Sequence, residues 1–142
     1  MRLLAYDKCY LDEMLQKHRY LFKLIGRNRT DAFKIIADYM NSDYRKNMDQ
    51  GNPLFLNKTP KQILQNMNIS VDINAPISET FDEFILEWMA DIYTYMQWRY
   101  NVPSGELVKK LEPEELYSKY YPLHEASIEN GADKLRNIYL NN

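Results

Sequence analysis

The sequence predicts an all-α protein: a single compact bundle of about six helices that forms one domain over residues 1–142. Three observations lead to this fold class: apolar residues recur at intervals of three and four, helix caps can be read from the chain, and only 4 of the 142 residues are glycine. A chain of this length buries about two thirds of its unfolded surface, so it can fold without disulfides or metal. We find no repeat, low-complexity segment or linker.

The first helix is predicted over residues 7–25, with one apolar stripe and with Gly26 as its terminator. The basic residues of its polar face lie toward its end, which suits the helix dipole. They recur every fourth residue: Arg19, Lys23 and Arg27.

A second helix is expected from Thr30 or Asp31 to about Met48, with a break at residues 41–43. The loop over residues 51–58 that follows carries more apolar side chains than a loop needs. These side chains either serve recognition or pack under the bundle as a satellite of the core.

A short third helix is well marked by its first residues. Thr59 can cap it, Pro60 suits its first position, and Gln62 can reach back in a capping box. Residues 69–73 then alternate between apolar and polar, which we interpret as an extended connector with at most a marginal strand.

The fourth and longest helix is predicted over residues 80–100, opened by a capping box from Thr80 to Glu83. Its aromatic and apolar side chains cover most of its circumference, so it belongs at the centre of the bundle. Its one continuous polar stripe is acidic and then reaches an aromatic residue, Trp98. Either the chain after Asn101 folds back over Trp98, or this side chain anchors a partner. The acidic members of the stripe are Glu83, Glu87 and Asp91.

Three shorter helices complete the bundle. Ser104 can cap one, Pro113 suits the first position of the next, which Pro122 closes, and the last runs over residues 127–140. Gly131 lies inside this last helix, where glycine costs about 1 kcal/mol relative to alanine. We therefore expect a close helix contact at Gly131.

The cysteine content, the start of the chain and the surroundings of the two histidines indicate the compartment and the reaction class. A single cysteine fits the reducing cytoplasm, the start of the chain meets charge too early for a signal peptide, and no apolar run approaches the roughly 20 residues of a membrane span. His18 lies on an apolar stripe, which favours a packed side chain. His124 and Glu125 lack the second histidine of a zinc-protease motif, because residue 128 is isoleucine. We predict no catalytic set, no metal and no cofactor, and hence a protein that is not an enzyme.

The C-terminal part of the chain, over about residues 84–140, resembles a family of short, helical, uncharacterised bacterial proteins. The resemblance is carried by Tyr121, by the segments 123–124 and 127–129, and by the turn at residues 100–106; the sequence departs from the family pattern at Glu125 and Asn130. Such families are often encoded near mobile-element or toxin genes, including ADP-ribosyltransferase-like ones. The resemblance thus implies an antitoxin or a regulator of a neighbouring effector. Physically, a capping hydroxyl and a backbone-bonding imidazole explain the motif as a structural joint made by Ser127 and His124.

Two function hypotheses follow. The first is a protein-interaction module, because tyrosine and tryptophan suit surfaces that are half buried and half wet. Its candidate partner-binding residues are Trp98, Tyr117, Tyr120, Tyr121, Glu83, Glu87 and Asp91. The alternative is binding of nucleic acid or another polyanion. Its candidate residues are Arg19, Lys23, Arg27 and Arg29.

The net charge of −2 is a cancellation between halves. Residues 1–71 carry a surplus of five positive charges, and residues 72–142 a surplus of seven negative charges. This polarity can hold the halves together, can pair copies of the chain head to tail as a homo-oligomer, or can offer an acidic face to a basic partner.

Overall fold

A computed structural model of the chain describes residues 3–141. All regular secondary structure in these residues is helical, and they contain no β-strand. This part of the chain forms ten α-helices and one 3₁₀-helix, where about six helices were predicted. The additional elements are short. The predicted helix from residue 30 or 31 to about Met48 is divided into two, as is the predicted helix that begins at Pro113, and the loop at residues 51–58 contains a helical turn. The bounds are η1 (Lys8–Tyr10), α1 (Leu11–Asn28), α2 (Ala32–Met40), α3 (Asp43–Asp49), α4 (Pro53–Leu56), α5 (Pro60–Asn66), α6 (Glu83–Tyr100), α7 (Ser104–Lys110), α8 (Pro113–Ser118), α9 (Tyr120–Leu123) and α10 (Ile128–Tyr139).

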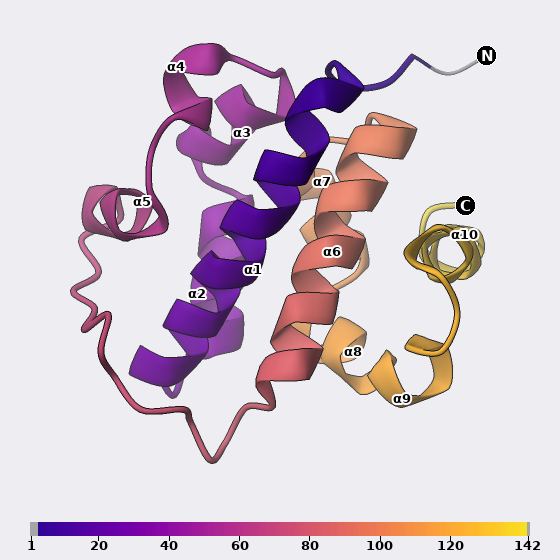
Figure 1. Cartoon of the computed structure of the whole chain (residues 1–142). Helices are drawn as coiled ribbons and strands as arrows, with labels where there is room; N and C mark the ends of the chain where they lie inside the picture. Colours follow the sequence, from indigo (N-terminus) through magenta and orange to yellow (C-terminus); the bar gives the residue numbers. More distant parts are fainter. Residues whose placement is uncertain (1–2, 142) are drawn as a thin grey trace.

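The two longest helices, α1 and α6, lie side by side at the centre of the molecule (Figure 1). They are antiparallel, because Arg19 pairs with Asp91 while Arg27, two turns later, pairs with Glu83. As predicted, α6 is buried over most of its circumference. Of its side chains only Phe84 and Arg99 are exposed.

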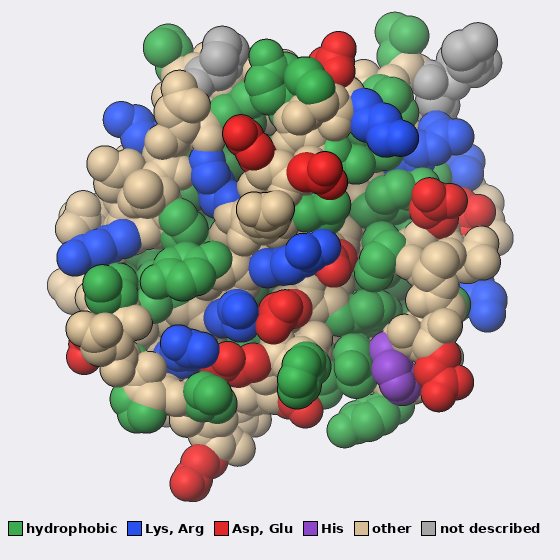
Figure 2. All heavy atoms as spheres, viewed as in Figure 1, with side chains coloured by type: hydrophobic (Ala, Val, Ile, Leu, Met, Phe, Trp, Pro, Cys, Tyr) green, Lys and Arg blue, Asp and Glu red, His purple; other side chains and the backbone are tan. Residues whose placement is uncertain are grey.

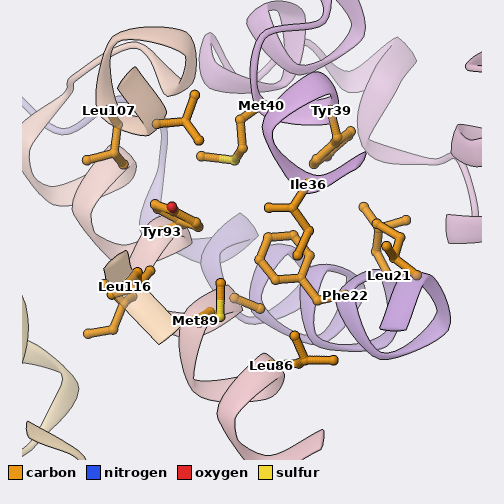
Figure 3. Packing of buried hydrophobic residues seen from close by; sticks show 14 of the residues in the cluster. Leu21, Phe22, Ile36, Tyr39, Met40, Leu86, Met89, Tyr93, Leu107 and Leu116 are labelled. Carbon is orange, nitrogen blue, oxygen red and sulfur yellow. The ribbon is translucent and has the colours of Figure 1, made fainter. Parts of the chain in front are cut away.

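The remaining helices pack around this pair. α5 lies against α1, α10 lies across α6 on the opposite flank, and α2, α7 and α8 pack behind (Figure 1). Side chains from five helices meet in the core between them (Figure 3). They include Leu21, Phe22, Ile36, Tyr39, Met40, Leu86, Met89, Tyr93, Leu107 and Leu116.

Two predicted boundaries of the central pair were wrong. Gly26 does not end α1, which continues to Asn28. A Cβ atom at Gly26 would lie 2.4 Å from the Leu86 Cδ1, so this glycine permits the close approach of α6. α6 begins at Glu83 with Asp82 as its cap, because the Asp82 carboxylate accepts from the Phe84 N–H.

Among the shorter helices, the capping box of Thr59 and Gln62 is present as predicted. Ser104 is the first residue of α7 instead of its cap, and Pro122 lies inside α9 instead of after it. The close contact expected at Gly131 is absent, since a Cβ there would meet its nearest atom, the Ile92 Cδ1, at an ordinary 3.7 Å. No helix between residues 3 and 141 combines the length and the apolar character needed to cross a bilayer.

Candidate functional site

The basic row of α1 and the acidic row of α6 face each other. Arg19 Nε lies 2.5 Å from Asp91 Oδ1, and Lys23 Nζ lies 3.5 Å from Glu87 Oε1. Arg27 binds Glu83 through two hydrogen bonds, Nε to Oε2 at 2.5 Å and Nη2 to Oε1 at 2.9 Å. Blue and red side chains accordingly alternate across the middle of the face in Figure 2. The residues proposed for two different functions thus form one ladder of ion pairs.

The two ends of this ladder differ in their electrostatics. At Glu83, the hydrogen bonds from Arg27 lower the pKa of the carboxyl. At Asp91, burial of the carboxylate raises its pKa and outweighs the opposing effect of Arg19. The Arg27–Glu83 pair therefore favours the ionised state of its acid, whereas the Arg19–Asp91 pair does not fully offset the desolvation of its acid.

The ladder also changes the charge that each half of the chain presents. Its three ion pairs neutralise three of the five surplus positive charges of residues 1–71 and three of the seven surplus negative charges of residues 72–142. Arg29, the fourth predicted polyanion contact, pairs with Asp31 at 2.9 Å. The acidic half thus keeps the larger surplus.

Trp98 is buried, with 6% of its surface exposed. Its indole N–H donates to the Tyr6 carbonyl at 2.9 Å, and its own carbonyl accepts from the Ala5 N–H at 3.0 Å. The N-terminal segment, which the sequence pattern did not indicate, therefore covers Trp98. This segment is 92 residues away in sequence, so the residue pattern around Trp98 could not predict that it buries the side chain.

The tyrosine cluster of the C-terminal half divides between core and surface. Tyr117 is half-buried against Phe33 and Phe81. Tyr120 packs edge-on against Trp88, and Tyr121 is 72% exposed.

Tyr120 and Tyr121, but not Tyr117, form part of a surface that we call the aromatic patch. Tyr120 contacts Tyr121 and stacks on His124 at a centroid distance of 4.5 Å. Phe84, one turn before Trp88 on α6, is 74% exposed. The patch comprises Phe84, Trp88, Tyr120, Tyr121 and His124, and hydrophobic side chains gather over the adjoining ends of α6 and α9 in Figure 2.

His124 and Ser127 hold the turn between α9 and α10. His124 Nδ1 lies 3.0 Å from the Tyr120 carbonyl oxygen and 3.1 Å from that of Tyr121. The Ser127 hydroxyl accepts from the Asn130 N–H and caps α10. Both side chains make contacts within their own turn, which fixes the direction in which α10 leaves the aromatic patch.

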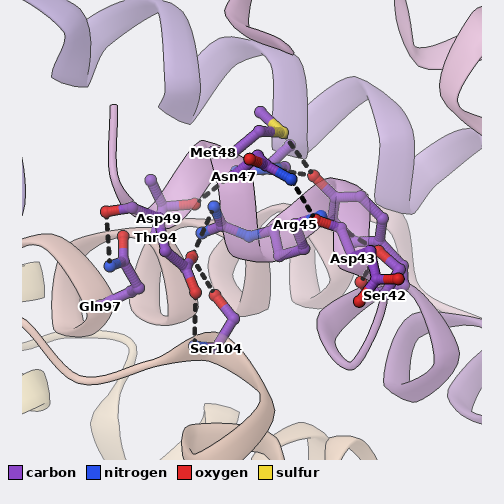
Figure 4. A network of polar contacts seen from close by, with 11 residues as sticks. Ser42, Asp43, Arg45, Asn47, Met48, Asp49, Thr94, Gln97 and Ser104 are labelled. Atoms are coloured by element: carbon purple, nitrogen blue, oxygen red, sulfur yellow. Dashed lines mark hydrogen bonds and ion pairs between the residues drawn. The ribbon is translucent and has the colours of Figure 1, made fainter. Parts of the chain in front are cut away.

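A buried ionic network joins α3, α6 and α7, and our sequence reasoning missed it (Figure 4). Arg45 is 1% exposed, and its Nη1 lies 2.9 Å from Asp49 Oδ1. The Asp49 carboxylate also accepts from the Ser104 N–H at 2.8 Å and from its hydroxyl at 2.5 Å. The spacing of four between Arg45 and Asp49 is the signal that could have revealed the pair.

His18 is fully enclosed, as its place on the apolar stripe predicted. Its Nδ1 lies 2.9 Å from the Thr94 hydroxyl and its Nε2 lies 2.7 Å from the Tyr39 hydroxyl. Burial lowers the pKa of this imidazole well below its usual value, and the charges of Arg45 and Lys17 lower it further. His18 is thus a neutral member of the core.

Comparison of the chain with family models, curated proteins and solved structures gives no match. Within residues 3–141, no three histidine, cysteine, aspartate or glutamate side chains converge as metal ligands would. The features that distinguish the surface are therefore the ladder, which is internally paired, and the aromatic patch, whose Phe84 and Tyr121 side chains are exposed.

Proposed function

We propose that this protein is a non-enzymatic interaction module that binds a partner protein through the aromatic patch, as an antitoxin or regulator of a neighbouring effector such as an ADP-ribosyltransferase-like toxin. The observation that carries the proposal is the exposure of Phe84 and Tyr121 at 74% and 72%, on either side of the packed rings of Trp88, Tyr120 and His124. Clustered, exposed aromatic side chains are typical of binding hot spots.

The patch is held in place before any partner arrives. Trp88 is anchored in the core, and His124 is fixed by the carbonyl oxygens of its own turn. A surface that is already ordered loses little conformational entropy on binding. This favours recognition of a partner without refolding of the patch.

The charge around the patch indicates the chemistry of the partner. Glu125 adjoins the patch in sequence, and residues 72–142 keep a negative surplus after the ladder is counted. We therefore expect a partner segment that combines apolar anchors with lysine or arginine.

The test is co-purification with the product of the neighbouring gene, followed by titration of the purified pair. Phe84→Ala and Tyr121→Ala should each weaken binding about tenfold or more, the range of an interface hot spot. Leu54→Ala and Ile138→Ala are matched controls, because these residues are 76% and 61% exposed outside the patch, and they should leave affinity unchanged. Equal affinity of all four variants, or no complex with the gene product, would overturn the proposal.

The polyanion alternative has less support, because its four candidate cations are all engaged in ion pairs. Binding of phosphates by the row on α1 would have to compete with the carboxylates of α6. Titration with mixed DNA and RNA at low ionic strength tests this alternative, and it requires an affinity that falls steeply with salt.

A further inference from the structure

A groove separate from the aromatic patch lies where the start of α1, the end of α6 and the start of α10 come together, and its volume is about 420 Å³. This volume falls within the range of small-molecule sites, about 300–1,000 Å³. Hydrophobic side chains line the hollow between α6 and α10 in Figure 2. Its apolar lining consists of Leu11, Leu15, Tyr95, Trp98 and Ile128.

The groove has a firm wall on the α6 side. Trp98 cannot rotate freely, because its indole N–H and its carbonyl are both bonded to the N-terminal segment. α1 and α10 both pack against α6, and Leu15 of α1 and Ile128 of α10 line the groove between them. A ligand would therefore find a largely pre-formed apolar slot.

Two cations line one end of the groove. Lys8 precedes α1 and Arg99 lies near the end of α6, and these ends adjoin because the two helices are antiparallel. Within residues 3–141, neither side chain has a carboxylate at ion-pair distance. By contrast, Arg19, which also lines the groove, is held by Asp91. Glu129 also lines the groove, so outside the Arg19–Asp91 pair the lining carries two cations and one carboxylate, a surplus of one positive charge.

The apolar part of the groove is short. On the α10 side, the adjoining hollow is lined by polar and charged residues, among them Glu129, Asp133 and Arg136. A long acyl chain would have to cross these groups and desolvate them. The groove therefore suits a ligand with a compact apolar part and not one with an extended acyl chain.

We propose that this groove binds a small organic anion, of the class of aromatic carboxylates. Its ring system packs against Tyr95, Trp98 and Ile128, and its carboxylate pairs with Lys8 and Arg99. An organic cation would face those two side chains unfavourably. A neutral molecule would leave the surplus positive charge of the lining without a counter-charge, so that the anion is the preferred occupant.

The experiment uses a matched pair of fluorescent probes and the full chain. 8-Anilinonaphthalene-1-sulfonate carries a sulfonate in place of the carboxylate, and N-phenyl-1-naphthylamine has the same rings without charge. We expect the sulfonate to bind the wild-type protein more tightly than the neutral probe does. The double variant Lys8→Gln/Arg99→Gln should lose about tenfold or more in affinity for the sulfonate and should keep its affinity for the neutral probe.

Two further variants make each outcome decisive. Lys134→Gln removes an exposed cation of α10 that does not line the groove, and it should bind both probes like the wild type. Phe84→Ala/Tyr121→Ala alters only the aromatic patch and should likewise leave sulfonate binding unchanged. The proposal is wrong if the wild type does not bind the sulfonate, if the Lys8/Arg99 variant binds it unchanged, or if the patch variant loses it.

Discussion

At the scale of single residues, the protein keeps an imidazole uncharged inside its core. Tyr39 and Thr94 satisfy both ring nitrogens of His18, so the neutral ring has no lost hydrogen bonds. A protonated ring would be desolvated and would lie in the field of Arg45 and Lys17. The cost of that charge makes folding depend on pH.

The first prediction concerns this dependence. In the unfolded chain His18 takes up a proton below pH about 6.5, whereas in the folded chain its lowered pKa keeps it neutral, so stability must fall as the pH falls. Between pH 7.5 and 5.5 we expect a loss of about 1 kcal/mol in the free energy of unfolding. Urea denaturation at several pH values measures it.

The variant His18→Gln should flatten that slope, whatever its stability at neutral pH. His124→Gln is the control: it retains His18 and should keep the wild-type slope. A slope in the His18→Gln protein as steep as that of the wild type would show that another group is responsible.

At the scale of helices, the two buried glycines differ in what surrounds them. At Gly26 a methyl group would clash with the Leu86 side chain, while at Gly131 it would make an ordinary contact with Ile92. Both lie within helices, where alanine is favoured by about 1 kcal/mol. The surroundings should therefore decide the sign of the substitution.

We predict that Gly131→Ala stabilises the protein by about 0.5–1 kcal/mol and that Gly26→Ala destabilises it by about 1–3 kcal/mol, because overpacking forces α1 and α6 apart. Thermal unfolding of the two variants side by side measures both effects. Destabilisation by Gly131→Ala would mean that α10 lies closer to α6 than its contacts indicate.

The ladder between α1 and α6 leads to a second prediction at this scale. Arg27→Glu places two carboxylates together at Glu83 and should cost about 1–2 kcal/mol, and the double variant Arg27→Glu/Glu83→Arg should recover part of this. Recovery is incomplete because Glu83 also lies in the first turn of α6, where the dipole favours an acid.

Chemical denaturation in urea gives the coupling energy of that double-mutant cycle, which should shrink in 1 M NaCl. The matched control is Lys34 and Asp38, an exposed pair on α2 whose reversal should leave stability nearly unchanged. Equal coupling in the two cycles would show that the ladder contributes no more than a surface pair.

At the scale of the whole molecule, local patterns in the sequence predicted the helices well, but they predicted poorly which helices and side chains contact one another. The helical class, the central place of α6 and the capping box at Thr59 follow from spacing and propensity, which act over a few residues. Ser104 shows why other predictions failed. Its hydroxyl suits a cap, but the buried Asp49, distant in sequence, binds it instead.

The candidate site failed to emerge from the sequence for the same reason. Helical periodicity revealed the basic and acidic rows separately, and charge counting suggested that the halves attract, but neither predicts that the rows align residue by residue. Trp98 stood out on its stripe, yet the segment that buries it lies 92 residues away at Tyr6. Such contacts depend on topology, which the local pattern does not encode.

The span of the ladder has a consequence for how the chain is made. Arg19 and Asp91 are 72 residues apart, so α1 leaves the ribosome long before the helix that covers it has been synthesised. Until then its apolar stripe has only α2 and α5 to pack against, and loop closure over this distance must precede the central packing. The newly made N-terminal half is therefore the form of this protein most exposed to chaperones and to aggregation.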